Sequence, residues 1–271
     1  MHPRLFHIGD YWQPTYGVMA ALGLLAAFFL IDHLAKRQHL NADRMWNLAG
    51  LAILSGLGGA KLLLVVNEWG YYGQHLREIF TTDTLLRAGG VFSGGFVLAV
   101  CVSWLYLRHA RIPFLRGADV MAPAIALGHA FGRLGCFSAG CCYGRPTNLP
   151  WGVTFTDPVA HAQVGTPLGI RLHPTQLYEF SAEAINFALL YWLIGRKKFE
   201  GQVIGLYLFL YGCERFVIEF FRGDTGRGTV FGGALTTTQL ISLGLVLAGS
   251  VLWFLRRPLI APAEGEEKHS S

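Results

Sequence analysis

Arginine and glutamate residues inside apolar stretches are the residues of this sequence most able to do chemistry. Arg133 lies in the apolar run 117–141, and Arg215, Glu219 and Arg222 lie in the run 201–222. A guanidinium inside a membrane is unfavourable by about 2.5–3.5 kcal/mol even on insertion scales, so it needs a partner or a functional role. Because guanidinium forks pair well with phosphate, the sequence favours an anion-binding site.

Composition places the chain among polytopic membrane proteins. Of its 271 residues, 52% are hydrophobic and 14% are charged, whereas soluble domains are about one quarter charged. The net charge of +5 comes from basic residues dispersed between apolar runs, which excludes a nucleic-acid-binding role. The first fifteen residues lack the basic-then-apolar order of a cleaved signal peptide.

The sequence predicts an all-α fold, a single domain over residues 1–260 with seven transmembrane helices. A span needs about twenty apolar residues to cross about 30 Å of hydrocarbon. Such runs occur at 16–32, 45–66, 89–108, 117–141, 173–194, 201–222 and 236–257. The loop 142–172, rich in Pro and Gly, is expected to form a small outer subdomain, and the polar tail 261–271 is expected to be disordered.

Loop charges predict the orientation of these spans. The loops 33–44, 108–116 and 195–200 and the C-terminal end are basic, whereas the alternate loops mix both signs. By the positive-inside rule the N-terminus lies outside and the C-terminus lies in the cytoplasm.

This orientation places polar and ionisable residues of six spans in the outer half of the membrane, and they include Tyr16, Lys61, Ser93, Arg133, His173, Glu179, Glu183, Arg215 and Glu219. Arg–Glu pairs could simply hold helices together, and His129 could be a packing residue. Convergence of so many costly groups at one depth favours a polar ligand site instead. A phosphate at that depth belongs most simply to a phospholipid head group.

Several motifs, in order along the chain, carry a family resemblance. They are Leu5–Gly9 with Tyr16-Gly17, Gly59–Leu62, Arg87–Gly95, Gly132–Phe137, Gly144–Gly152, His173–Glu179 and Arg215–Arg222. With these motifs the chain resembles the prolipoprotein diacylglyceryl transferases over nearly its whole length. Seven spans with an external N-terminus are also that family's topology.

The resemblance implies a multi-pass enzyme of the bacterial inner membrane. Such an enzyme moves the diacylglyceryl group of phosphatidylglycerol to the lipobox cysteine thiol of a prolipoprotein and releases glycerol phosphate. It implies an active site toward the outer leaflet, no cofactor and no metal. Since the site is expected to be complete within one chain, a monomer is expected.

The resemblance also assigns residues. Arg133 and Arg215 are expected to stabilise the leaving phosphate, Glu219 to orient Arg215, and Arg222 to lie nearer the head-group surface. The other residues expected to bind substrate are Tyr16, Lys61, Ser93, Gly94, Gly95, Gly132, Cys136, Gln176, Tyr178 and Glu179.

The chain departs from the family pattern at three positions. Cys136 stands where an asparagine is usual, Cys141 where a glutamate is usual, and Ser93 where a histidine is usual. The histidine is the most obvious general base, so its role passes to His173, Glu219 or His129, in that order. Alternatively, the field of the arginines lowers the pKa of the incoming thiol without a dedicated base.

The cysteines allow further interpretations. Cys136, Cys141 and Cys142 do not match the usual zinc spacing, and on one helix Cys136 and Cys142 are too far apart for one metal. They are expected to be packing residues, or to form a disulfide if the helix ends near residue 140; Cys101 and Cys213 are expected in the core. The rival functions are a non-catalytic phospholipid head-group binding or transport protein and a membrane thiol-redox module.

Overall fold

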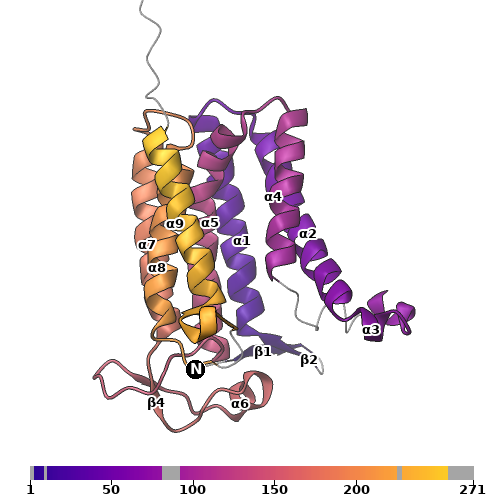
Figure 1. Cartoon of the computed structure of the whole chain (residues 1–271), viewed down its shortest axis with the longest axis vertical. Coiled ribbons are helices and arrows are strands. Elements are labelled where there is room, and N and C mark those ends of the chain that lie inside the picture. The colour runs from indigo at the N-terminus through magenta and orange to yellow at the C-terminus, as the bar shows by residue number, and fades with distance from the viewer. Residues whose placement is uncertain (1–2, 9–10, 81–91, 225–227, 256–271) are drawn as a thin grey trace, which may run out of the picture. The chain divides into compact units, whose positions relative to one another are not determined.

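The computed structural model describes residues 3–8, 11–80, 92–224 and 228–255 of the chain (Figure 1). Seven long helices dominate the described residues. They are α1 (Thr15–Arg37), α2 (Ala42–Asn67), α4 (Phe92–His109), α5 (Phe114–Ala139), α7 (Thr175–Ile194), α8 (Gln202–Glu219) and α9 (Thr237–Leu255). Each overlaps one predicted apolar run, with ends that agree to within about five residues, so the positions of these helices match the prediction.

Shorter elements connect these helices. The strands β1 (Arg4–Ile8) and β2 (Tyr11–Pro14) pair antiparallel ahead of α1, a hairpin that the sequence analysis did not predict. The predicted outer loop contains β3 (Val153–Thr154), α6 (Pro158–Val164) and β4 (Arg171–Leu172), with β3 paired to β4. The remaining short elements are α3 (Trp69–Tyr72), η1 (Leu76–Phe80), β5 (Thr229–Val230), η3 (Phe231–Gly233) and β6 (Leu235–Thr236).

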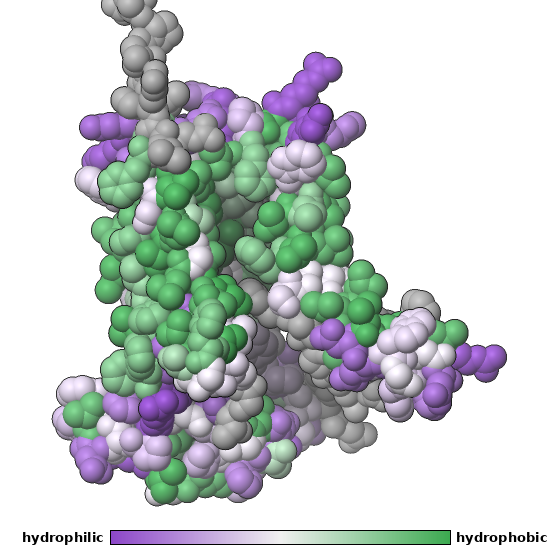
Figure 2. All heavy atoms as spheres, in the orientation of Figure 1, coloured by the Kyte–Doolittle hydropathy of each residue, from purple (hydrophilic) through white to green (hydrophobic). Residues whose placement is uncertain are grey.

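The helices carry the surface of a helical membrane protein. Among the described residues, α1, α2, α5 and α9 are long and apolar enough to cross a membrane. Large apolar side chains are exposed along the helices, among them Phe29, Leu54 and Leu247, each 66–69% exposed. Figure 2 shows apolar side chains over the sides of the helices and polar ones toward their ends. Such an apolar surface is unfavourable in water and suits lipid.

The chain forms two compact units, each described by itself. The first unit comprises the described residues up to Leu30 and from Ala118 onward, and it contains most of α1 with α5, α7, α8 and α9. Small residues allow its helices to approach closely: a Cβ on Gly249 of α9 would lie 2.5 Å from the Gly205 carbonyl oxygen of α8. A Cβ on Gly135 of α5 would lie 3.0 Å from the Tyr16 ring of α1.

A buried carboxylate connects α5 to the start of α8. Asp119 is fully buried and accepts hydrogen bonds from Lys197 Nζ at 2.8 Å and from the backbone N–H groups of Gly201, Val203 and Ile204 at 2.9–3.0 Å. The first N–H groups of a helix lack intrahelical partners, and Gly201 has no side chain to cap them. Asp119 therefore caps α8 from a neighbouring helix and fixes the register of α8 against α5.

The second unit runs from Ile31 to Gly117, and its core is the pair α2 and α4. Glycines form this helix interface: a Cβ on Gly59 would lie 2.5 Å from the Gly94 oxygen, and a Cβ on Gly95 would lie 2.6 Å from the Gly56 oxygen. Close backbone approach of this kind is typical of helix pairs in membranes. In the segment after α2, Tyr71 donates to Glu78 at 2.7 Å, which raises the pKa of the Tyr71 phenol.

Candidate active site

Glu179 lies at the centre of three arginines. Its fully buried carboxylate contacts Arg133 Nη2 of α5 at 2.6 Å, Arg215 Nη1 of α8 at 3.0 Å and Arg222 Nη1 at 3.3 Å. The Arg133 contact is an ion pair without well-aligned hydrogen-bond geometry at Glu179 Oε2. One negative charge thus draws together three positive charges from two helices and the segment after α8.

The spacing of polar residues along α7 explains this placement. Gln176, Glu179 and Glu183 follow one another at intervals of three and four residues, so they share one helix face. All three side chains are fully buried. Because α7 otherwise presents an apolar surface, this polar stripe turns toward the polar residues of α5 and α8.

His129 connects Arg133 to Glu183. Arg133 Nε donates to His129 Nε2 at 3.0 Å, and His129 Nδ1 lies 2.8 Å from Glu183 Oε1. Because His129 Nε2 accepts a hydrogen bond, the ring proton lies on Nδ1, and Nδ1–H donates a hydrogen bond to Glu183 Oε1. In this arrangement His129 is a neutral residue that orients Arg133, and its basic nitrogen is already occupied.

One further carboxylate, that of Glu219, completes the network at its other end. Arg215 Nη2 lies 3.4 Å from Glu219 Oε2, and Glu219 Oε1 accepts from Thr236 Oγ1 at 2.9 Å. The Arg215–Glu219 contact was expected, but Glu179 is the closer partner of Arg215. Thr236 belongs to β6, and no motif or spacing in the sequence indicates its contribution.

Arg222 differs from its expected position. α8 ends at Glu219, so Arg222 lies three residues beyond the helix, although the predicted span 201–222 includes it. Its Nε and Nη2 donate to both oxygens of Asp224 at 2.8 and 2.6 Å, and its side chain is only 4% exposed. The bidentate pair with Asp224 keeps the Arg222 side chain buried, and its expected place nearer the head-group surface stays a prediction.

Arg133 is the arginine most able to take a ligand. Its side chain is 15% exposed, against 9% for Arg215 and 4% for Arg222. Among the described residues, Arg133 Nη1 has no hydrogen-bond partner, whereas all three nitrogens of Arg222 are used. Beside Arg133, a Cβ on Gly132 would meet no atom within 4 Å. Arg133 thus keeps one donor that no described residue engages.

Tyr16 borders the same segment of α5. It lies in the first turn of α1, is 46% exposed, and packs its ring against Gly135. A Cβ on Gly135 would lie 3.0 Å from the Tyr16 Cδ2 atom, so glycine at this position leaves room for the Tyr16 ring.

His173 belongs to a separate cluster at the start of α7. Its Nδ1 lies 3.1 Å from Tyr178 Oη, which accepts from Trp151 Nε1 at 2.8 Å, and its ring packs on Phe221. These contacts do not include the three arginines. His173 and Tyr178 were predicted site residues, whereas Trp151 was not, because no spacing rule connects Trp151 to α7.

Gly144 holds this cluster against the end of α8. Gly144 N donates to the His173 oxygen at 3.0 Å, and Gly144 pairs with Arg222 in an isolated β-bridge. A Cβ on Gly144 would lie 2.5 Å from His173 Cβ. Only glycine fits where these backbones cross, so the outer loop is fixed to both α7 and α8.

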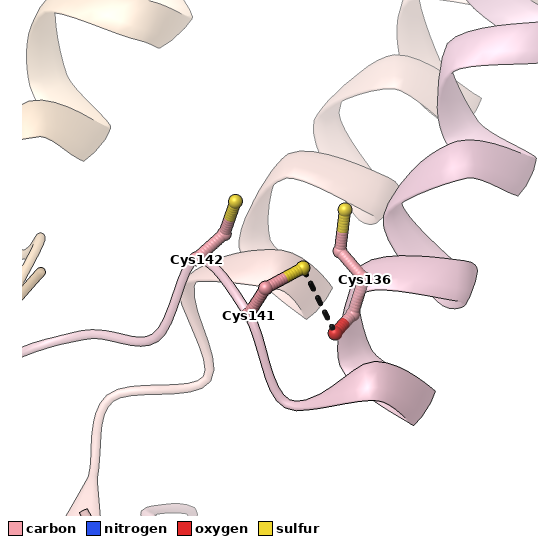
Figure 3. Close-up of side chains that lie close together, drawn as sticks. All are labelled: Cys136, Cys141 and Cys142. Carbon is pink, nitrogen blue, oxygen red and sulfur yellow. Dashed lines mark hydrogen bonds between the residues drawn. The ribbon is translucent and has the colours of Figure 1, made fainter. Parts of the chain in front are cut away.

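The cysteine-rich segment also differs from its prediction. α5 ends at Ala139, two residues earlier than expected, and a turn follows. The Sγ atoms of Cys136, Cys141 and Cys142 lie within 4.8 Å of one another (Figure 3). The argument that Cys136 and Cys142 are too far apart for one metal is therefore wrong. All cysteines are free thiols, and Cys101 and Cys213 are exposed on their helices rather than in the core.

Four predicted residues belong to the other unit. Lys61 lies on α2, while Ser93, Gly94 and Gly95 lie in the first turn of α4. Gly94 and Gly95 pack against α2, and Ser93 is exposed. Arg87, part of the motif ahead of them, falls outside the described residues. Their part in substrate binding stays a prediction.

Comparison with known proteins shows the family of the chain. The family model described as prolipoprotein diacylglyceryl transferase matches residues 3–255. A phosphatidylglycerol–prolipoprotein diacylglyceryl transferase of Clostridium tetani is 36% identical over 261 residues, covering 95% of this chain and 98% of the relative. Proteins of the same name from Finegoldia magna and Bordetella parapertussis are each 34% identical, over 92% and 94% of this chain and 92% and 96% of their own length. The chain belongs to the prolipoprotein diacylglyceryl transferase family.

Proposed function

We propose that this protein transfers the diacylglyceryl group of phosphatidylglycerol to the lipobox cysteine of prolipoproteins. The single observation that carries the proposal is Arg133, which Glu179 and His129 hold in place while, among the described residues, its Nη1 makes no hydrogen bond. A positioned guanidinium with a spare donor is suited to a phosphate whose charge grows during reaction.

The reaction is a displacement at the phosphate-bearing carbon of the diacylglyceryl group. The thiolate sulfur forms a bond to this carbon as the carbon–oxygen bond breaks, and glycerol phosphate leaves with both bonding electrons. The substrate thiol gives up its proton, and the phosphate gains one unit of negative charge. Arg133, supported by Arg215, would stabilise that charge more strongly in the transition state than in the bound lipid.

Proton removal is assigned to His173 in this proposal. Its Nδ1 is engaged by Tyr178, and among the described residues its Nε2 makes no contact. His129 is a poorer candidate because its Nε2 already accepts from Arg133. Glu219 is poorer too, because Arg215 and Thr236 engage both its oxygens.

The proposal also covers topology and location. Seven spans are expected from the apolar runs, and an external N-terminus and a cytoplasmic C-terminus are expected from the positive-inside rule. The protein would lie in the bacterial inner membrane as a monomer, with Arg133 toward the outer leaflet, where phosphatidylglycerol and secreted prolipoproteins are both accessible. Helix α7 carries the charged residues Glu179 and Glu183 because they face α5 and α8 rather than lipid.

A reconstituted assay tests the activity. Purified protein, phosphatidylglycerol labelled in its terminal glycerol and a lipobox peptide should release labelled glycerol phosphate. A matched peptide with serine in place of the lipobox cysteine should release none. Lipid binding without release of glycerol phosphate would favour the rival head-group binding protein. Release that does not depend on the peptide thiol would favour a lipase.

A further inference from the structure

Three thiols converge where α5 ends. The chain reverses after Ala139, with φ of 82° at Gly140 and 62° at Cys142. A positive φ is uncommon for a residue other than glycine, so the backbone at Cys142 is strained. The turn brings the Sγ atoms of Cys141 and Cys142 to within 4.8 Å of Cys136 and of each other (Figure 3).

Buried side chains hold this turn at three successive carbonyl groups. The Gly140 oxygen accepts from Thr166 Oγ1 at 3.0 Å. The Cys141 oxygen accepts from Gln176 Nε2, and the Cys142 oxygen accepts from Thr175 Oγ1, both at 2.7 Å. All three donor side chains are fully buried. The thiols are therefore preorganised by a supporting shell, as a binding site requires.

One polar atom beside the turn has no partner. Within the described part of the chain, Gln176 Oε1 is buried and makes no hydrogen bond, although the same amide group holds Cys141. Buried acceptors are nearly always satisfied in native proteins, so an orphan indicates a missing water or ligand.

The chemistry of the cluster selects the ligand. Among the described residues the cluster consists of three cysteines and includes no histidine or carboxylate. Structural zinc takes four ligands, whereas soft thiolates favour Cu(I). With metal–sulfur bonds of about 2.3 Å, three sulfurs around one ion lie about 4 Å apart. The three Sγ atoms lie within 4.8 Å of one another, which is close to this value. We propose that Cys136, Cys141 and Cys142 bind one Cu(I) ion as a three-coordinate thiolate site.

Binding would change the charge beside Arg133. Three thiols would release their protons to solvent, and copper would stay Cu(I), so the loaded site would carry two net negative charges. Arg133 precedes Cys136 by three residues on α5, so both lie on one helix face. The loaded site would therefore attract Arg133 and compete with an anionic ligand for it.

A competition titration tests the site. The purified full chain, in detergent without oxygen, is titrated with Cu(I) against a chromophoric Cu(I) chelator. One ion per chain is expected, with at least 100-fold weaker binding after Cys136→Ser, Cys141→Ser or Cys142→Ser. The matched controls Cys101→Ser and Cys213→Ser should bind as the wild type does. X-ray absorption should give three sulfur neighbours at about 2.3 Å.

Cysteine labelling gives a second readout that needs no variant. In the wild type, Cu(I) should protect Cys136, Cys141 and Cys142 from alkylation and leave Cys101 and Cys213 reactive. Equal binding by the triple-serine variant, unchanged alkylation, or tighter binding of Zn(II) than of Cu(I) would overturn the proposal. Because each readout is independent of lipid transfer, an inactive transferase would leave this test intact.

Discussion

Arg133 Nη2 lies 2.6 Å from Glu179 Oε2, and the other oxygen of the same carboxylate pairs with Arg215 and Arg222. Glu179 is fully buried, so its charge is not screened by water. A buried ion that loses its partner is strongly destabilising. Glu179 is therefore the residue on which the geometry of the arginines depends most.

Glu179→Gln should impair both stability and activity. It keeps the shape of the side chain but leaves three buried guanidinium groups without their shared countercharge. Breaking a buried pair typically destabilises by about 3–5 kcal/mol. Thermal unfolding in detergent should show a markedly lower midpoint, and transfer should fall below detection. Glu200→Gln in the basic loop 195–200 is the matched control; equal behaviour of the two variants would contradict the central role of Glu179.

Arg133→Lys and Arg222→Lys should separate ligand binding from support of the fold. Lysine cannot reproduce a guanidinium fork. Arg133 has a free donor, so its variant should lose at least 100-fold in kcat/KM with little change in thermal stability. Arg222 uses all its nitrogens within the protein, so its variant should mainly lower the unfolding midpoint. The reverse pattern would assign the ligand to Arg222.

Gly132→Ala should act on substrate binding alone. A Cβ at this position meets nothing within 4 Å, and alanine favours a helix over glycine by about 1 kcal/mol, so the fold should be retained or stabilised. If lipid occupies the space beside Arg133, the added methyl group should raise KM for phosphatidylglycerol several-fold. Gly58→Ala, which also meets nothing within 4 Å, should leave KM unchanged. An unaltered KM in both variants would place the lipid elsewhere.

His173→Gln and His129→Gln should differ in their pH profiles. A histidine base changes charge between about pH 5 and 8, so it produces a fall in rate toward acidic pH. His173→Gln should lower the rate about 100-fold and abolish the fall in rate toward acidic pH, which is called the acidic limb. Replacing His129 should weaken lipid binding through Arg133 and keep the limb. An acidic limb that survives His173→Gln would favour thiol activation by the arginines alone.

The sequence predicts the helices better than it predicts their contacts. Apolar runs of about twenty residues identify the seven helices because burial in lipid imposes length and composition together. Spacing along one helix also predicts the Arg215–Glu219 contact. No spacing rule measures distances between helices, so the shared role of Glu179 and the contribution of Thr236 emerge only from the fold.

Local backbone geometry explains the remaining differences. Gly140 ends α5 in the left-handed conformation, and this turn creates a thiol cluster that a continuous helix would forbid. Similarly, α8 ends at Glu219, and Asp224 rather than helical spacing determines the position of Arg222. The β1–β2 hairpin lies in a polar, aromatic segment that carries no clear strand pattern.

The most direct measurement is complementation of a bacterial strain depleted of its own diacylglyceryl transferase. Wild type, Arg133→Ala, Arg215→Ala and the control Arg171→Ala are compared at equal membrane levels. Growth and lipoprotein modification with the wild type and Arg171→Ala, and their loss with Arg133→Ala and Arg215→Ala, are the predicted result. Growth with Arg133→Ala, or no growth with a well-expressed wild type, would contradict the assignment of Arg133 as the phosphate ligand of an active transferase.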